Sequence, residues 1–113
     1  MSHRIASRVA SERSMGSQHK RELKASLLHA QAGLCFYCER PVSAERATID
    51  HFIPQTYGGA WVQENLIVAC LCCNGRKANK LPSDGQLTRM AALKGIPRSK
   101  LWAIREQIIM GET

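Results

Sequence analysis

The chain has 113 residues, and its 16 Lys and Arg outnumber its nine Asp and Glu to give a formal net charge of +7. This length suits one domain, and we expect no membrane span and no signal peptide because no apolar run is long enough for either. The basic balance is compatible with a nucleic-acid partner without establishing one.

The positive charge is concentrated at the N-terminus, because residues 1–33 hold six Lys and Arg against two acids, whereas residues 34–80 carry +1 and residues 81–113 carry +2. Residues 1–17 are rich in Ser and Arg and poor in apolar side chains, which predicts a flexible basic arm. Such an arm either becomes ordered on a phosphate backbone or is a frayed terminus. A transit peptide has similar composition, but the short length and Glu12 disfavour one.

Residues 18–113 are predicted to form a single domain with a core at residues 33–80. A helix is expected over 19–32, where Leu23, Leu27 and Ala30 recur at helical spacing. Two short strands are expected at 47–51 and 66–69, followed by a short helix over 74–79.

The C-terminal part is predicted to be helical between residues 84 and 110. Ser83 and Gln86 have the spacing of a capping box, which predicts a helix that continues to Gly95. A last helix is expected over 98–110. Together with the helix at 19–32, these helices are predicted to cover the small core.

Two Cys-x-x-Cys pairs, Cys35/Cys38 and Cys70/Cys73, predict a structural zinc site. Four thiolates close a tetrahedral coordination sphere, and the 32 positions between Cys38 and Cys70 mean that the ion would join two distant turns. Thiolates on zinc, and an odd number of cysteines, favour a reducing compartment and hence the cytoplasm. The fifth cysteine, Cys72, is expected to be a small buried side chain or an exposed thiol, although it could replace Cys73.

An Asp-His/Asn/Asn series lies between and just after these pairs. Asp50-His51 is followed by Asn65, 14 positions after the His, and by Asn74, nine further on and directly after Cys73. With Pro54, Gly58-Gly59 and Lys77, these residues resemble the HNH endonuclease family over residues 33–80.

The resemblance implies an α+β fold, a small ββα-metal, treble-clef-like module held together by zinc and flanked by helices. It implies that Asp50 and Asn74 hold one divalent ion and that His51 is the general base. It also implies that Asn65 fixes the loop and orients His51. An Asn at the last motif position is a hard ligand, which favours Mg²⁺ or Mn²⁺.

The chemistry of these side chains fits phosphodiester hydrolysis independently. A neutral His suits the removal of a proton from water, while carboxylate and amide oxygens suit Mg²⁺. Alternation along a strand would nevertheless point Asp50 and His51 to opposite sides, unless the strand ends or twists there. The short helix after the second Cys pair brings three further cations, Arg76, Lys77 and Lys80, which we expect to contact phosphates.

The predicted function is therefore a metal-dependent endonuclease that cuts DNA and leaves 5′-phosphate and 3′-hydroxyl ends. Phage packaging or restriction systems are candidate partners. The main alternative is a non-catalytic zinc module that binds DNA or RNA, and a protein-interaction zinc domain is a third reading. Each of Asp50, His51, Asn65 and Asn74 taken alone also has a structural explanation, as a buried pair, a turn residue or a helix cap.

Overall fold

The computed structural model describes residues 16–111, so the basic arm predicted in residues 1–17 lies almost wholly outside the described residues. The chain divides into two compact units, whose described parts are residues 16–79 and 80–111. None of the helices in this described part is long and apolar enough to cross a bilayer. The prediction that residues 18–113 act as a single domain stays a prediction.

The first unit is built on an antiparallel hairpin of strands β1 (Ala47–His51) and β2 (Leu66–Cys70). Its register pairs Asp50 with Ile67 and His51 with Leu66. The loop between the strands contains two short 3-10 turns, Gln55–Tyr57 and Gln63–Asn65. Both predicted strands are confirmed, because runs of β-branched and apolar residues this short fit one half-buried and one buried strand.

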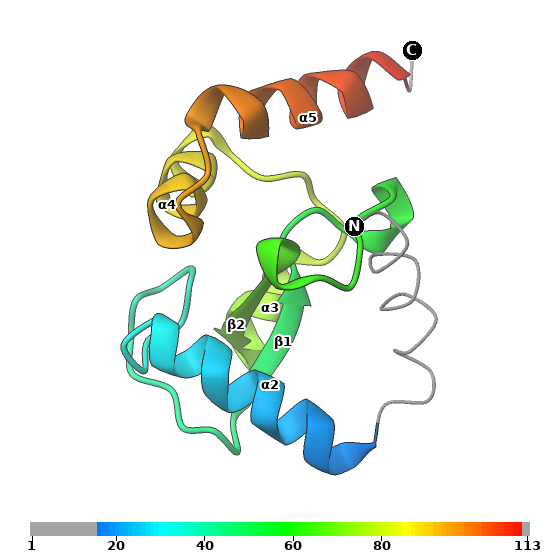
Figure 1. Ribbon diagram of the computed structural model, residues 1–113. Helices are drawn as coiled ribbons and strands as arrows, with labels where there is room; N and C mark the ends of the chain where they lie inside the picture. The colour runs from blue at the N-terminus through cyan, green and yellow to red at the C-terminus, as the bar shows by residue number, and fades with distance from the viewer. Residues whose placement is uncertain (1–15, 112–113) are drawn as a thin grey trace. The chain divides into compact units, whose positions relative to one another are not determined.

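Helix α2 (Ser17–Ala30) packs against this hairpin through its apolar stripe (Figure 1). Leu27 joins Ala47, Leu66 and Val68 in the core cluster. At the end of the helix, the Gln31 side chain accepts a hydrogen bond from the backbone N–H of Val68 at 2.8 Å and donates one to its carbonyl at 3.0 Å. One glutamine side chain thus ties the helix end to the middle of β2.

Helix α3 (Leu71–Lys77) begins three residues before the predicted start at Asn74. The second Cys-x-x-Cys turn is itself the first turn of this helix, since Cys70 is its N-cap and its Sγ accepts from the backbone N–H of Cys73 at 3.4 Å. Strand, strand and helix with a neighbouring cysteine cluster form the compact α+β arrangement predicted, consistent with a ββα-metal module.

The second unit contains α4 (Asp84–Lys94) and α5 (Arg98–Gly111), which contact each other. The predicted capping box is present, with Ser83 and Gln86 bonded reciprocally, and Gly95 ends the helix at a positive φ of 67°. Arg105 of α5 forms an ion pair with Asp84 at 2.7 Å. Both helices therefore begin and end close to where the sequence predicts, and their covering of the first unit stays a prediction.

Candidate active site and metal centre

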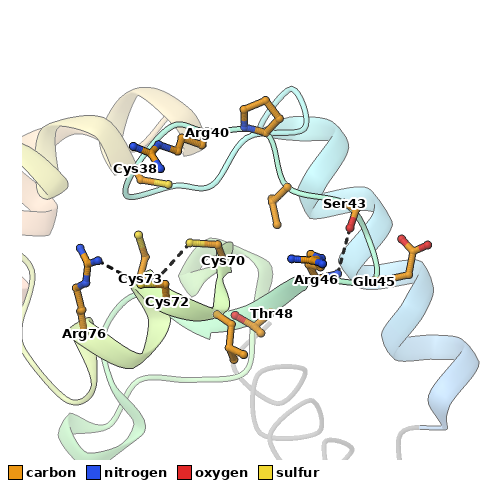
Figure 2. Close-up of a pocket in the computed structure, with 13 residues that line it drawn as sticks. Cys38, Arg40, Ser43, Glu45, Arg46, Thr48, Cys70, Cys72, Cys73 and Arg76 are labelled. Carbon is orange, nitrogen blue, oxygen red and sulfur yellow. Dashed lines mark hydrogen bonds between the residues drawn. The ribbon is translucent and has the colours of Figure 1, made fainter.

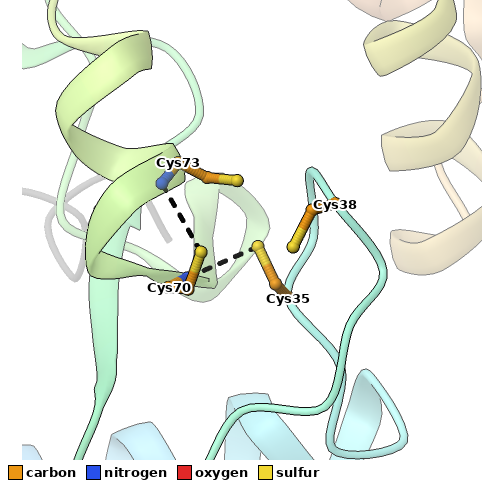
Figure 3. Close-up of side chains that lie close together, drawn as sticks. All are labelled: Cys35, Cys38, Cys70 and Cys73. Carbon is orange, nitrogen blue, oxygen red and sulfur yellow. Dashed lines mark hydrogen bonds between the residues drawn. The ribbon is translucent and has the colours of Figure 1, made fainter.

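The four cysteines of the two Cys-x-x-Cys pairs form one cluster (Figure 3). Cys35 and Cys38 lie on the loop after α2, while Cys70 and Cys73 lie at the junction of β2 and α3. Their sulfur atoms all lie within 4.8 Å of one another, and none is in a disulfide. Sulfurs at zinc–sulfur distances of about 2.3 Å in a tetrahedron would be roughly 3.8 Å apart, so this cluster could hold a zinc ion after a small contraction.

Burial and hydrogen bonds within the cluster shift the pKa values of two of its cysteines. Burial raises the pKa of Cys35, but hydrogen bonds from the backbone of Cys38 and Cys70 outweigh it and lower the pKa to about 7. Burial and hydrogen bonds to its cysteine neighbours raise the pKa of Cys73 to about 12. The negative charge of Cys35 contributes to that rise, and a divalent metal would remove the repulsion between such thiolates.

Cys72 lies outside the cluster. Its side chain is exposed, and the Arg76 guanidinium donates a hydrogen bond to its sulfur at 3.2 Å. The structure therefore places Cys73, and not Cys72, beside Cys70. Of the two environments expected for this fifth cysteine, the exposed thiol is the one observed.

Three residues of the predicted catalytic series line a single hollow of about 340 Å³: Asp50, His51 and Asn74. The alternation of a strand does not separate Asp50 from His51, because His51 is the last residue of β1 and a bend follows it at once. Helix α3 brings Asn74 to the same hollow from the other end of the hairpin. Side chains from two separate segments of the chain therefore line one hollow.

Asp50 is held by two side chains. The Tyr37 hydroxyl donates to its Oδ2 at 2.7 Å, and the Lys77 ammonium lies 3.3 Å from the same oxygen. Lys77 also donates to the carbonyl of His51. Burial and the charge of Asp50 raise the pKa of Tyr37 far above its usual value. Burial lowers the pKa of Lys77, and the Asp50 carboxylate opposes that fall.

The sequence predicts that Lys77 contacts a phosphate, but in the structure Lys77 is buried and paired with Asp50. Only 5% of its side chain is exposed, and 9% of that of Asp50. A contact between Lys77 and a phosphate would require the ion pair with Asp50 to open. Tyr37 is a contact of Asp50 that the sequence did not predict, although its position inside the first Cys-x-x-Cys pair places it beside the centre of the module.

Asn65 fastens the loop between the two strands. Its Oδ1 accepts from the backbone N–H of Ile53 at 2.8 Å, and its Nδ2 donates to the carbonyls of Ile53 and Ala60, both at 3.1 Å. Gly59 allows this close approach, since a Cβ there would lie 1.7 Å from the Ile53 oxygen. The amide thus fixes the segment that directly follows His51, which is what a loop-fixing role would need.

Two further contacts position His51 and Asn74. The indole of Trp61 packs against the His51 imidazole, with ring centroids 5.0 Å apart. Asn74 Nδ2 donates to the Thr48 hydroxyl at 2.9 Å, which assigns its carbonyl oxygen as the atom left to act as an acceptor or ligand. A carboxylate and an amide oxygen beside one hollow are the donor types that suit Mg²⁺ or Mn²⁺, but the Asp50 carboxylate is already paired with Lys77 and would have to exchange that partner for the ion.

The remaining predicted phosphate contacts lie at the surface. Arg76 is exposed on α3, and Lys80 is exposed at the start of the second unit. Both side chains are thus accessible to a polyanion, in contrast to Lys77.

Comparison with known families agrees with these observations. Residues 35–90 match the family model described as HNH endonuclease. The matched segment contains the whole cysteine cluster as well as Asp50, His51, Asn65 and Asn74. The chain belongs to the HNH endonuclease family. No curated protein was found to match it.

Replacing Asn65 with Ala is expected to lower the free energy of unfolding by about 1–3 kcal/mol, because three backbone groups of the loop lose their partner. Urea unfolding of the purified protein measures this change. Gln63→Ala is the matched control, since Gln63 is an exposed residue of the same 3-10 turn. Equal unfolding midpoints for the two variants would contradict the loop-fixing role.

Proposed function

We propose that this protein is a metal-dependent endonuclease that hydrolyses DNA phosphodiester bonds. The observation that carries the proposal is that Asp50, His51 and Asn74 line one hollow, inside a segment that matches the HNH endonuclease family. His51 accepts a proton from the attacking water, since a neutral imidazole is suited to that transfer near neutral pH. Asn65 and Trp61 keep the loop and the imidazole in place for this step.

Asp50 and Asn74 would hold Mg²⁺ or Mn²⁺ in this proposal. When bound, such an ion supplies positive charge that stabilises the phosphate and the leaving oxygen in the transition state. Tyr37 orients the Asp50 carboxylate through its 2.7 Å hydrogen bond, and Thr48 orients the Asn74 amide. In-line attack by water then breaks the bond to the 3′ oxygen and leaves 5′-phosphate and 3′-hydroxyl ends.

We assign zinc to the four-cysteine cluster as a structural ion, because four sulfur ligands leave no open position for substrate. Thiolate ligands of this kind persist in a reducing compartment, which suits a cytoplasmic protein. Arg76 and Lys80 would contact the phosphate backbone of DNA, and Lys77 would join them only if its ion pair with Asp50 opened. A phage packaging or restriction system is a fitting biological setting for such a nuclease.

The alternative is a non-catalytic zinc module that binds nucleic acid. The buried Asp50–Lys77 ion pair favours it, because such a pair also serves as a purely structural contact. Nicking of a supercoiled plasmid separates the two functions. Cleavage with Mg²⁺ or Mn²⁺ that EDTA stops, giving ends that ligase can rejoin, supports the endonuclease. Binding without cleavage under every divalent ion tested supports the alternative.

Replacing Lys77 with Gln is expected to tighten the binding of Mg²⁺ or Mn²⁺ by at least about tenfold. The ammonium lies 3.3 Å from Asp50 and neutralises the charge that the metal would need. Leaving one charge of a buried pair without its partner lowers the free energy of unfolding by about 3–5 kcal/mol. A divalent ion bound at Asp50 would restore part of this loss, and a recovery of about 1.4 kcal/mol corresponds to tenfold tighter binding of the ion.

Titration calorimetry measures the affinity of this variant for the metal, and urea unfolding without added divalent ion measures its stability. Lys77→Arg keeps the positive charge and is the control. If Lys77→Gln bound the ion no more tightly than Lys77→Arg, the ammonium would not compete with the metal at Asp50.

A further inference from the structure

A second and larger hollow is lined in part by three cysteines of the cluster, Cys38, Cys70 and Cys73 (Figure 2). We call it the arginine groove, after the three arginines in its wall, Arg40, Arg46 and Arg76. Its volume is about 1170 Å³. Arg40 and Arg46 come from the loop between the first Cys pair and β1, whereas Arg76 comes from α3 on the opposite wall (Figure 2). Three arginines from two segments therefore line the same hollow.

The side chains of these arginines are exposed at the protein surface. Glu45 is the one acid in the lining. Ion pairs found among residues 16–111 join Lys77 to Asp50 and Arg105 to Asp84, and these include neither Arg40 nor Arg46. Guanidinium groups present a planar fork of donors that matches the oxygens of a phosphate. The groove is thus suited to a ligand that carries several phosphates along its length.

A hydrogen bond joins a residue of the groove to a residue of the hollow that Asp50, His51 and Asn74 line. Thr48 lines the groove, Asn74 lines the catalytic hollow, and Asn74 Nδ2 donates to the Thr48 hydroxyl at 2.9 Å. Leu71 also lines the groove and is 73% exposed, although it is apolar. A ligand that follows the groove towards Asn74 would cover this leucine.

We propose that the arginine groove binds the sugar-phosphate backbone of the DNA strand that flanks the cleaved phosphate. In this arrangement Arg40, Arg46 and Arg76 contact successive phosphates, and Leu71 packs against a sugar or a base. The proposal rests on the proposed function for the position of the cleaved phosphate. It adds Arg40, Arg46 and Leu71 to the residues that bind substrate.

The arginines also have a purely local explanation. A divalent ion with four thiolates carries a formal charge of −2, and cations near it would reduce that charge. Arg40 lies two residues after Cys38, and Arg76 donates to the sulfur of Cys72. If this were their only role, their loss would weaken zinc retention and leave the binding of DNA unaffected.

The test measures duplex binding as a function of salt, with zinc-loaded full-length protein and without added Mg²⁺, so that no cleavage occurs. Arg40→Gln/Arg46→Gln is expected to reduce the slope of log affinity against log salt by up to about 1.8, because each lost phosphate contact removes about 0.9. Lys20→Gln/Arg21→Gln is the matched control, since it removes the same charge from the exposed face of α2. Circular dichroism and zinc content verify that each variant is folded.

Leu71→Ser provides a second and independent test. Because Leu71 carries no charge, its loss is expected to weaken binding by about tenfold at every salt concentration without changing the slope. This combination separates an apolar contact with the strand from a general effect on charge. Unchanged affinity would exclude Leu71 from the interface.

The proposal is overturned if Arg40→Gln/Arg46→Gln changes the slope no more than the control does. Loss of zinc from that variant with an unchanged slope would assign the arginines to the cysteine cluster alone. Failure of the proposed function gives a different result: wild-type protein would not cleave DNA, yet the slope would still fall in the arginine variant. Absence of any duplex binding by wild-type protein would overturn both proposals.

Discussion

Replacing His51 with Ala is expected to slow DNA cleavage by at least about 10²-fold, the scale on which a positioned general base contributes. Binding of DNA and retention of zinc should not change, because His51 lies outside the cysteine cluster and at the end of β1. The rate of plasmid nicking at saturating Mg²⁺ measures the effect. Saturating Mg²⁺ ensures that the change in rate reports proton transfer and not a lower affinity for the ion.

His29→Ala is the matched control for this prediction, because His29 is an exposed residue in the last turn of α2. It should cut at the wild-type rate. Asp50→Asn is expected to behave differently from both, since it should raise the concentration of Mg²⁺ needed for cleavage. If folded His51→Ala protein cut as fast as the wild type, His51 would not be the general base.

Removing zinc is expected to unfold the first unit. The unit is small, with one core cluster centred on Leu27, Ala47, Leu66 and Val68 and further buried side chains that include Phe36, Phe52 and Ile67. A module of this size seldom folds on apolar burial alone. Zinc binding is worth about 10–16 kcal/mol in zinc-finger peptides, which equals or exceeds the whole stability of an ordinary domain. Circular dichroism during titration with a strong chelator measures the loss of structure, and elemental analysis should find about one zinc per chain.

Two cysteine substitutions make this prediction specific. Cys38→Ser removes one sulfur of the cluster and should lower zinc content and stability together. Cys72→Ser changes an exposed cysteine outside the cluster and should leave both unchanged. Metal analysis that found no zinc in folded, active protein would contradict a structural zinc ion at this position.

Much of the first unit could be predicted from the sequence, because local patterns determine it. Leu23 and Leu27 fall on one helical stripe, and the apolar run before Cys70 has the length of one buried strand. Even the cysteine cluster follows from ligand chemistry and spacing. Helix α3 begins earlier than predicted because the turn that presents Cys70 and Cys73 is also the first turn of the helix. The spacing of the cysteines alone does not indicate that their turn is helical.

The contacts around Asp50 could not be predicted in the same way. A lysine after a cysteine turn is usually exposed, and only the folded hairpin shows that Lys77 lies buried beside Asp50. The hydrogen bond from Tyr37 joins residues 13 positions apart and depends on how the first cysteine turn packs. Long-range polar contacts of this kind have no periodic pattern in the sequence.

The way in which Asn65 fastens the loop has a consequence for how such an enzyme could be redesigned. The three hydrogen bonds of this side chain end on backbone atoms of Ile53 and Ala60. They therefore impose no requirement on the side chain of Thr56, which is exposed and lines the hollow beside His51. In the proposed endonuclease, Thr56 is therefore the position where substitutions would alter the preference for the bases beside the cut while the backbone that carries His51 keeps its path.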